Sequence, residues 1–174
     1  ILEDFLRFAG RMKLDSEPTQ LNGLVDELVD FYEPQALQSD VRLRCTLAEG
    51  LPDIVIDRKL IKQAVLNLLI NATQAMVKAK YDGVAHGGAD ELIIRTEAKA
   101  DELVLHVIDT GPGIDEPTME RIFEPYFSTK RGGSGLGLAT SRRIVEEHGG
   151  SLTVHTDLGR GTDFAIVLPR SDGD

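Results

Sequence analysis

Apolar residues recur at steps of three and four along residues 59–78, which predicts a long helix lying on a hydrophobic core. Polar side chains recur at the same steps and, at about 100° per residue, fall within one quadrant of that helix. They are Gln63, Asn67, Asn71, Gln74 and Lys78. Amides beside an apolar surface need polar partners wherever they are covered. The stripe is therefore either a solvated helix face, which is the commoner case, or one wall of a binding site.

The rest of the chain mixes helical and alternating patterns. Helical periods cover 21–38, 117–123 and 137–148. Alternation and β-branched residues predict strands over 41–48, 92–98, 102–109, 151–157 and 162–169, and a shorter one within 50–57. The LGRG turn is typical of a hairpin between the last two strands. This mixture indicates an α+β fold, a two-layer α/β sandwich with a mixed, mostly antiparallel sheet and helices on one face.

Two of these helices have candidate N-caps. Asp57 is placed to cap the long helix, and Thr19 or Asn22 could cap the helix over 21–38. Pro34 lies inside that second pattern, where we expect it to kink the helix.

Residues 1–14 form an apolar stripe that has no evident partner. We expect this stripe to be the end of an upstream helical element, followed by a polar linker over 15–20. The main domain should then span 21–169, and residues 170–174 should form a disordered tail.

Composition narrows the function classes. A chain of 174 residues is long enough for one domain with a full core. The net charge of −10 and the lack of a basic cluster argue against a nucleic-acid surface. One cysteine excludes a disulfide framework and suits a reducing compartment. No apolar run approaches the ~20 residues that a membrane span needs.

Asp109 ends the strand over 102–109, where its carboxylate needs a hydrogen-bond donor. Alternation places it on the apolar face of that strand, where an unpaired carboxylate costs several kcal/mol. A hydrogen-bond donor should therefore meet it. Gly111 and Gly113 follow, and they allow a turn and a close backbone approach to a flat ligand. By itself, an aspartate that closes a strand is more often a structural cap.

A glycine-rich segment over 132–138 runs directly into the helix over 137–148. Such an entry presents free N–H groups and the positive end of the helix dipole to an anion. It is not a Walker loop, because no GK[ST] follows, and it lacks the third glycine of GxGxxG. Lys130 and Arg131 precede it and could add charge to a phosphate site. The alternatives are a flexible linker and solvated basic side chains.

The order of five motifs identifies a family. The motifs are similar to an asparagine box (NLLINA, 67–72), a first glycine box (DTGPGI, 109–114), a phenylalanine box (FEPYFSTK, 123–130), a second glycine box (GGSGLGL, 132–138) and a closing threonine element (GTDF, 161–164). About residues 20–168 thus resemble the catalytic, ATP-binding domain of sensor histidine kinases. That domain has the Bergerat-type fold of the ATPase superfamily that includes gyrase, Hsp90 and MutL. The NATQAM run is most similar to the nitrogen-regulation-like branch.

The resemblance implies that ATP and Mg²⁺ bind together. Asn71 would coordinate the Mg²⁺ that bridges the phosphates, and Asn67 would support the ion from one turn earlier. Asp109 would accept a hydrogen bond from the adenine amino group, and Thr162 would help to position the base through water. The backbone beside the purine would be that of Gly111, Gly113 and Ile114.

The same resemblance implies a lid around the phosphates. Phe123 and Phe127 would anchor the base of this lid. Its phosphate-facing groups would come from Lys130, Ser134, Gly135, Leu136, Gly137 and Leu138.

Two positions depart from the family pattern. Gln74 stands where many of these kinases have a phosphate-contacting lysine, and Lys78, one turn later, is a possible substitute. Asn67 stands where the hydrolytic relatives have a glutamate that activates water. Because asparagine has no titratable carboxylate, phosphoryl transfer to a protein is favoured over hydrolysis.

The phosphoacceptor implied by the resemblance is a histidine followed by an acidic residue on a dimerisation domain. None of the four histidines here has that context, so this chain would hold no catalytic residue of its own. Residues 1–14 would be the end of the dimerisation hairpin. The implied partners are that hairpin and the receiver domain of a response regulator, in a homodimeric parent. The implied location is cytoplasmic, whether or not the parent is anchored in a membrane.

Two other functions stay open. One is a kinase of the same fold that phosphorylates serine on an anti-sigma antagonist. The other is a degenerate domain that acts only as a nucleotide-binding or protein-interaction module.

Overall fold

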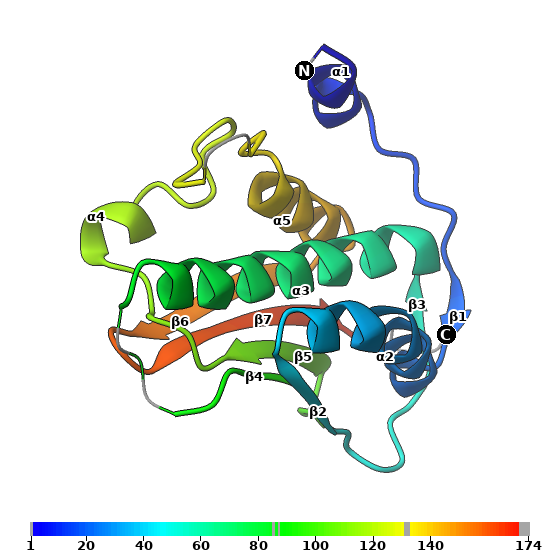
Figure 1. Cartoon of the computed structure of the whole chain (residues 1–174). Coiled ribbons are helices and arrows are strands. Elements are labelled where there is room, and N and C mark those ends of the chain that lie inside the picture. Colours follow the sequence, from blue (N-terminus) through cyan, green and yellow to red (C-terminus); the bar gives the residue numbers. More distant parts are fainter. Residues whose placement is uncertain (1, 85, 87, 131–132, 171–174) are drawn as a thin grey trace.

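The computed structural model describes residues 2–84, 86, 88–130 and 133–170. A five-stranded sheet forms one layer, and helices cover one of its faces (Figure 1). Its strands, in spatial order, are β2 (Arg42–Thr46), β4 (Glu91–Ala98), β5 (Glu102–Asp109), β7 (Gly161–Pro169) and β6 (Ser151–Asp157). β2 runs parallel to β4, and the other neighbours are antiparallel. The predicted α+β sandwich is confirmed.

Three helices form the second layer. They are α2 (Leu21–Gln38), α3 (Arg58–Tyr81) and α5 (Gly137–Glu147). α3 lies between the other two and crosses the middle of the sheet (Figure 1). Pro34 lies inside α2, which continues to Gln38.

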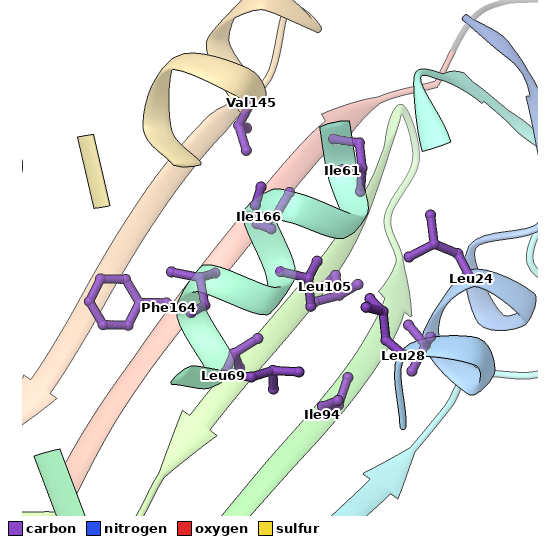
Figure 2. Close-up of a cluster of buried hydrophobic side chains, with 14 of the residues drawn as sticks. Leu24, Leu28, Ile61, Leu69, Ile94, Leu105, Val145, Phe164 and Ile166 are labelled. Atoms are coloured by element: carbon purple, nitrogen blue, oxygen red, sulfur yellow. The ribbon is translucent and has the colours of Figure 1, made fainter. Parts of the chain in front are cut away.

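The core fills the space between the two layers. Side chains from α2, α3 and α5 meet those of β4, β5 and β7 there (Figure 2). Fully or almost fully buried members are Leu24, Leu28, Ile61, Leu69, Ile94, Leu105, Val145, Phe164 and Ile166. Burying each such side chain contributes roughly 1.5–3 kcal/mol. This packing fixes α3, and with it the amide stripe, against the sheet.

Asp57 caps α3 as the sequence predicts. Its Oδ1 accepts the Leu60 N–H at 3.1 Å, and its Oδ2 accepts the Asp15 N–H at 2.9 Å. The Asp57 N–H in turn donates to Nε2 of His148, the residue that follows α5, at 3.0 Å. The start of α3 is therefore tied both to the end of α5 and to the chain that enters the domain.

The predicted caps of α2 are wrong. Gln20 is the N-cap residue, and no side chain caps the helix. Thr19 belongs to β1 (Glu17–Thr19), which pairs with β3 (Ile54–Ile56), and its hydroxyl donates to Glu17 O. The Asn22 side chain is used elsewhere, because it donates to Ala48 O. Pairing with a distant strand thus overrides the local capping signal, and it also places part of the predicted linker in a small sheet.

The remaining helices are short. α4 (Glu116–Met119) covers only part of the helix predicted over 117–123. α1 (Leu2–Ala9) lies apart from the two layers (Figure 1). Of the tail predicted over 170–174, residues 171–174 lie outside the described residues, and the Arg170 N–H donates to Asp101 O at 2.8 Å. Among the described helices, none combines the length and the apolar character needed to cross a membrane.

Candidate functional site

A cavity of about 460 Å³ lies between α3, the ends of β5 and β7, and the segment that leads from α4 to α5. Fourteen of the sixteen binding residues predicted from the sequence line it. They are Asn67, Asn71, Gln74, Lys78, Asp109, Gly113, Ile114, Phe127, Lys130, Ser134, Gly135, Gly137, Leu138 and Thr162. The other two, Gly111 and Leu136, are buried, and each is adjacent in sequence to a residue that lines the cavity. The fold thus brings together motifs from across the chain.

Asp109 forms a buried acidic end of this cavity. It is only 5% exposed and pairs across the strands with Thr162. Burial raises the pKa of Asp109 to about 6, although hydrogen bonds from the backbone N–H groups of Gly111, at 2.9 Å, and Thr162 oppose the rise. At neutral pH the carboxylate is therefore mostly ionised and can only accept hydrogen bonds. It suits a ligand that offers a donor.

The turn after Asp109 depends on glycine. Gly113 has a φ of +76°, and a Cβ there would lie 2.6 Å from Asp157 O in β6. The turn therefore packs directly on the β6–β7 hairpin. The next N–H, of Ile114, donates to Thr156 Oγ1 at 2.8 Å.

The amide stripe of α3 is a cavity wall. Asn67, Asn71, Gln74 and Lys78 all line the cavity, whereas Gln63 is exposed and lies outside it. Asn67 Nδ2 donates to Gly137 O at 3.3 Å, which joins α3 to the first residue of α5. Lys78 pairs with Asp82, one turn further along the chain. All members of the stripe but the first therefore line the cavity, and two of them, Gln74 and Lys78, are also exposed to solvent.

Lys130 reaches across the cavity to α3. Its Nζ donates to Asn71 Oδ1 and to Gln74 Oε1, both at 2.8 Å. Burial lowers the pKa of Lys130 to about 8. The Asn71 carboxamide oxygen thus binds a cation in this structure, and that cation is the Lys130 ammonium group.

The glycine-rich segment closes the site from the α5 side. Gly135 has a φ of +71°, and a Cβ there would lie 2.5 Å from the Tyr126 carbonyl carbon. The Tyr126 N–H donates to Gly135 O at 3.0 Å, so this close approach is held by a backbone hydrogen bond. Arg131 and Gly132 lie outside the described residues. The first turn of α5, whose N–H groups have no partner within the helix, lines the cavity through Gly137 and Leu138.

Two phenylalanines hold the segment before it. The Arg121 guanidinium lies 4.4 Å from the centre of the Phe127 ring, and Arg142 of α5 lies 5.1 Å from that of Phe123. Phe127 lines the cavity, and Phe123 packs against the core. That these two rings anchor the base of a lid stays a prediction.

Sequence reasoning did not single out several residues that line the cavity, among them Ile70, Val84 and Thr118. It also missed Thr156, which lies behind the cavity wall and contacts both Ile114 and Thr162 through its hydroxyl. The available signal was the alternation of β6, which places Thr156 on the same face as Leu152 and Val154.

Comparisons with known proteins agree with this geometry. Residues 56–172 match the family of histidine kinase-, DNA gyrase B- and HSP90-like ATPases. The chain is 33% identical over 170 residues to the signal transduction histidine-protein kinase AtoS of Escherichia coli K12, a match that covers 97% of this chain and 26% of AtoS.

Two solved structures share the fold. Full-length ShkA in complex with AMPPNP superposes with a TM-score of 0.83 at 26% identity, over 99% of this chain and 36% of ShkA. The histidine kinase ThkA, in complex with the response regulator protein TrrA, gives 0.78 at 25% identity, over 98% of this chain and 46% of ThkA. The chain thus spans less than half of each of these relatives. It belongs to the histidine kinase-, DNA gyrase B- and HSP90-like ATPase family, as the catalytic ATPase domain of a sensor histidine kinase.

Proposed function

We propose that this chain binds ATP with Mg²⁺ in the cavity beside α3 and supplies the γ-phosphoryl group to a histidine of a dimerisation domain. One observation carries the proposal. A single cavity has a buried carboxylate, Asp109, in its wall together with an amide–ammonium pair, Asn71 and Lys130. These groups suit the two ends of ATP, which are an amino-bearing base and a phosphate chain with its metal ion.

Asp109 would bind the adenine end of ATP. An ionised carboxylate needs a donor, and the adenine amino group supplies one. A hydrogen bond to a charged group of this kind is worth about 1.5–3 kcal/mol. Apolar surface for the base comes from Ile114 and Phe164, and both line the same cavity.

Asn71, and Asn67 one turn before it, would hold the Mg²⁺ at the phosphate end of ATP. Neutral amide oxygens suit Mg²⁺, which proteins commonly hold with one or two groups while the phosphates of the substrate complete its shell. The Asn71 oxygen already receives a cation, the Lys130 ammonium. When bound, the metal neutralises charge on the phosphates. Lys130 and the first turn of α5 supply further positive charge and N–H donors there.

Asn67 favours transfer over hydrolysis. It has no titratable carboxylate with which to activate water, and its Nδ2 is engaged with Gly137 O. The contribution of this chain is therefore to position ATP and to stabilise the charge that develops during transfer.

The proposed acceptor lies on a dimerisation domain of the parent, of which α1 would be the last part. Three of the four histidines have structural bonds that account for them: His86 with Asp90, His106 with Asp163 and His148 with Asp57. The ThkA–TrrA complex supports a receiver domain of a response regulator as the onward partner. The parent would be a homodimer.

Nucleotide titration and an acceptor assay test this function together. AMPPNP should bind the chain more tightly with Mg²⁺ than without it. With labelled ATP, an added dimerisation hairpin should acquire acid-labile label, and the chain alone should acquire none. Acid-stable label on an added anti-sigma antagonist would instead indicate a serine kinase. Absence of nucleotide binding would indicate a degenerate interaction module.

A further inference from the structure

Three polar side chains lie next to one another on neighbouring strands. Asp109 on β5 pairs with Thr162 on β7, and Thr162 pairs with Thr156 on β6. Asp109 and Thr162 are each 5% exposed and line the cavity. Thr156 is half-buried beside Thr162 and lies outside the cavity wall. It is the member of this row that a ligand in the cavity does not reach.

The Thr156 hydroxyl has no bonding capacity to spare. It donates its one hydrogen to Gly161 O at 3.2 Å and accepts the Ile114 N–H at 2.8 Å. Its remaining neighbour is Thr162 Oγ1, at 3.1 Å. A hydroxyl has one hydrogen and two lone pairs, so with the Thr156 hydrogen directed to Gly161 O, which can only accept, Thr162 is the donor in that last contact.

This assignment determines what Thr162 can offer to the cavity. Its hydrogen points to Thr156, which leaves oxygen lone pairs for a ligand or a water molecule. Together with the Asp109 carboxylate, the cavity end then presents acceptors only. An amino group on the ligand can donate hydrogen bonds to these acceptors, which strengthens binding. A carbonyl oxygen in its place weakens binding, because a buried acceptor that faces another acceptor stays unpaired.

We propose that Thr156 is a positioning residue for base selectivity, which holds Thr162 as an acceptor so that a 6-aminopurine is chosen over a 6-oxopurine. This inference rests on the proposed binding of ATP in the cavity. Thr156 acts without touching the nucleotide. Through the Ile114 N–H it also anchors the backbone that lines the base, so one hydroxyl aligns two parts of the wall.

Substitutions at Thr156 test the proposal. Thr156→Val keeps the shape but removes the acceptor, so the Thr162 hydrogen is free to turn toward the cavity. Thr156→Ser keeps the hydroxyl and serves as the matched control. ATP and ITP, which carry an amino group and an oxygen at the same ring position, are titrated calorimetrically with Mg²⁺ against each variant. The measured quantity is the ratio of their dissociation constants.

The wild-type chain and Thr156→Ser should prefer ATP to the same degree, and Thr156→Val should reduce that preference by about tenfold. An unchanged preference in Thr156→Val, or an equal loss in Thr156→Ser, would overturn the proposal while leaving ATP binding intact. A wild-type chain that binds neither nucleotide would overturn both this inference and the proposed function.

A second variant keeps the test decisive if Thr156→Val does not fold. Thr162→Ala removes the hydroxyl that Thr156 orients, so it should reduce the preference for ATP over ITP by a similar factor. If the preference stays at the wild-type value in a folded Thr162→Ala chain, then Thr162 does not read the base and Thr156 has nothing to position.

Discussion

Lys130 Nζ lies 2.8 Å from Asn71 Oδ1, so the lysine of the proposed lid is bound to the oxygen proposed for Mg²⁺. In the proposed complex, an ammonium group and Mg²⁺ would compete for this one oxygen, and their like charges disfavour holding both there. We therefore expect binding of ATP with Mg²⁺ to move Lys130 away from α3 and toward the phosphates, which can take up its charge. The site would then exchange one cation for another when it is filled.

The first prediction concerns the two amides that hold Lys130. Asn71→Ala should lower the affinity for AMPPNP by about tenfold or more in the presence of Mg²⁺, because the metal loses a ligand, and should change it little without Mg²⁺. Gln74→Ala, which removes the other partner of Lys130, should have a much smaller effect with Mg²⁺. Calorimetric titrations with and without the metal measure both. A loss that is equal in the two conditions would remove Asn71 from the metal site.

The second prediction concerns the charge of Lys130. With a pKa of about 8, about half of these side chains are neutral at pH 8 in the free domain. Bound phosphates favour the charged form, so nucleotide binding at pH 8 should take up protons, and affinity should decrease as the pH rises further. Titrations in buffers of different ionisation enthalpy measure the uptake. Lys130→Met should abolish it, whereas Lys78→Met should retain it; uptake that persists in Lys130→Met would assign it to another group.

The third prediction concerns the stability cost of burying Asp109. Its folded-state pKa, about 6, lies above the usual 3.8, so the folded chain holds this proton more tightly than the unfolded chain. This contribution favours folding at low pH and is lost as the pH rises through 6. Relative to Asp109→Asn, which does not titrate, the wild-type free energy of unfolding should fall by about 1.4 kcal/mol between pH 5 and pH 7.5. Urea unfolding at both pH values checks this, and a constant difference would show that the carboxyl is not destabilised by burial.

The fourth prediction concerns the start of α3. Asp57→Ala removes the acceptor of the Leu60 and Asp15 N–H groups, so the domain should lose about 2 kcal/mol of stability. Asp115→Ala is the matched control, because Asp115 caps only the four residues of the exposed α4 and should cost less than about 1 kcal/mol. Thermal or urea unfolding compares the two. Equal losses of unfolding free energy would mean that the cap of α3 contributes no more to stability than the cap of α4.

Local pattern was enough to predict much of the fold and two parts of the site, whereas the other site residues were predicted from the resemblance of five ordered motifs to a known family. Period-two alternation placed Asp109 on the core face, and the helical period placed Asn67, Asn71 and Gln74 on one wall. Both periods follow from the geometry of a single element, so they can be read without knowledge of its neighbours. The Asp57 cap was predicted for the same reason.

Contacts between distant segments were beyond those patterns. Thr19 looked like a cap, but it pairs with β3 instead. The bond from Lys130 to Asn71 joins residues 59 positions apart, and the role of Thr156 depends on the register of β6 with β7. The packing of the two layers determines which polar groups come into contact. The hydrophobic periodicity of a single helix or strand does not reveal these pairs.

Calorimetric titration of AMPPNP with Mg²⁺ into the wild-type chain and into Asp109→Asn tests the central claim most directly. If the adenine amino group rests on this carboxylate, the variant should bind more weakly by about 1.5–3 kcal/mol, the value of a hydrogen bond to a charged group. The same affinity for both chains would show that the base binds elsewhere, and would contradict the proposed site.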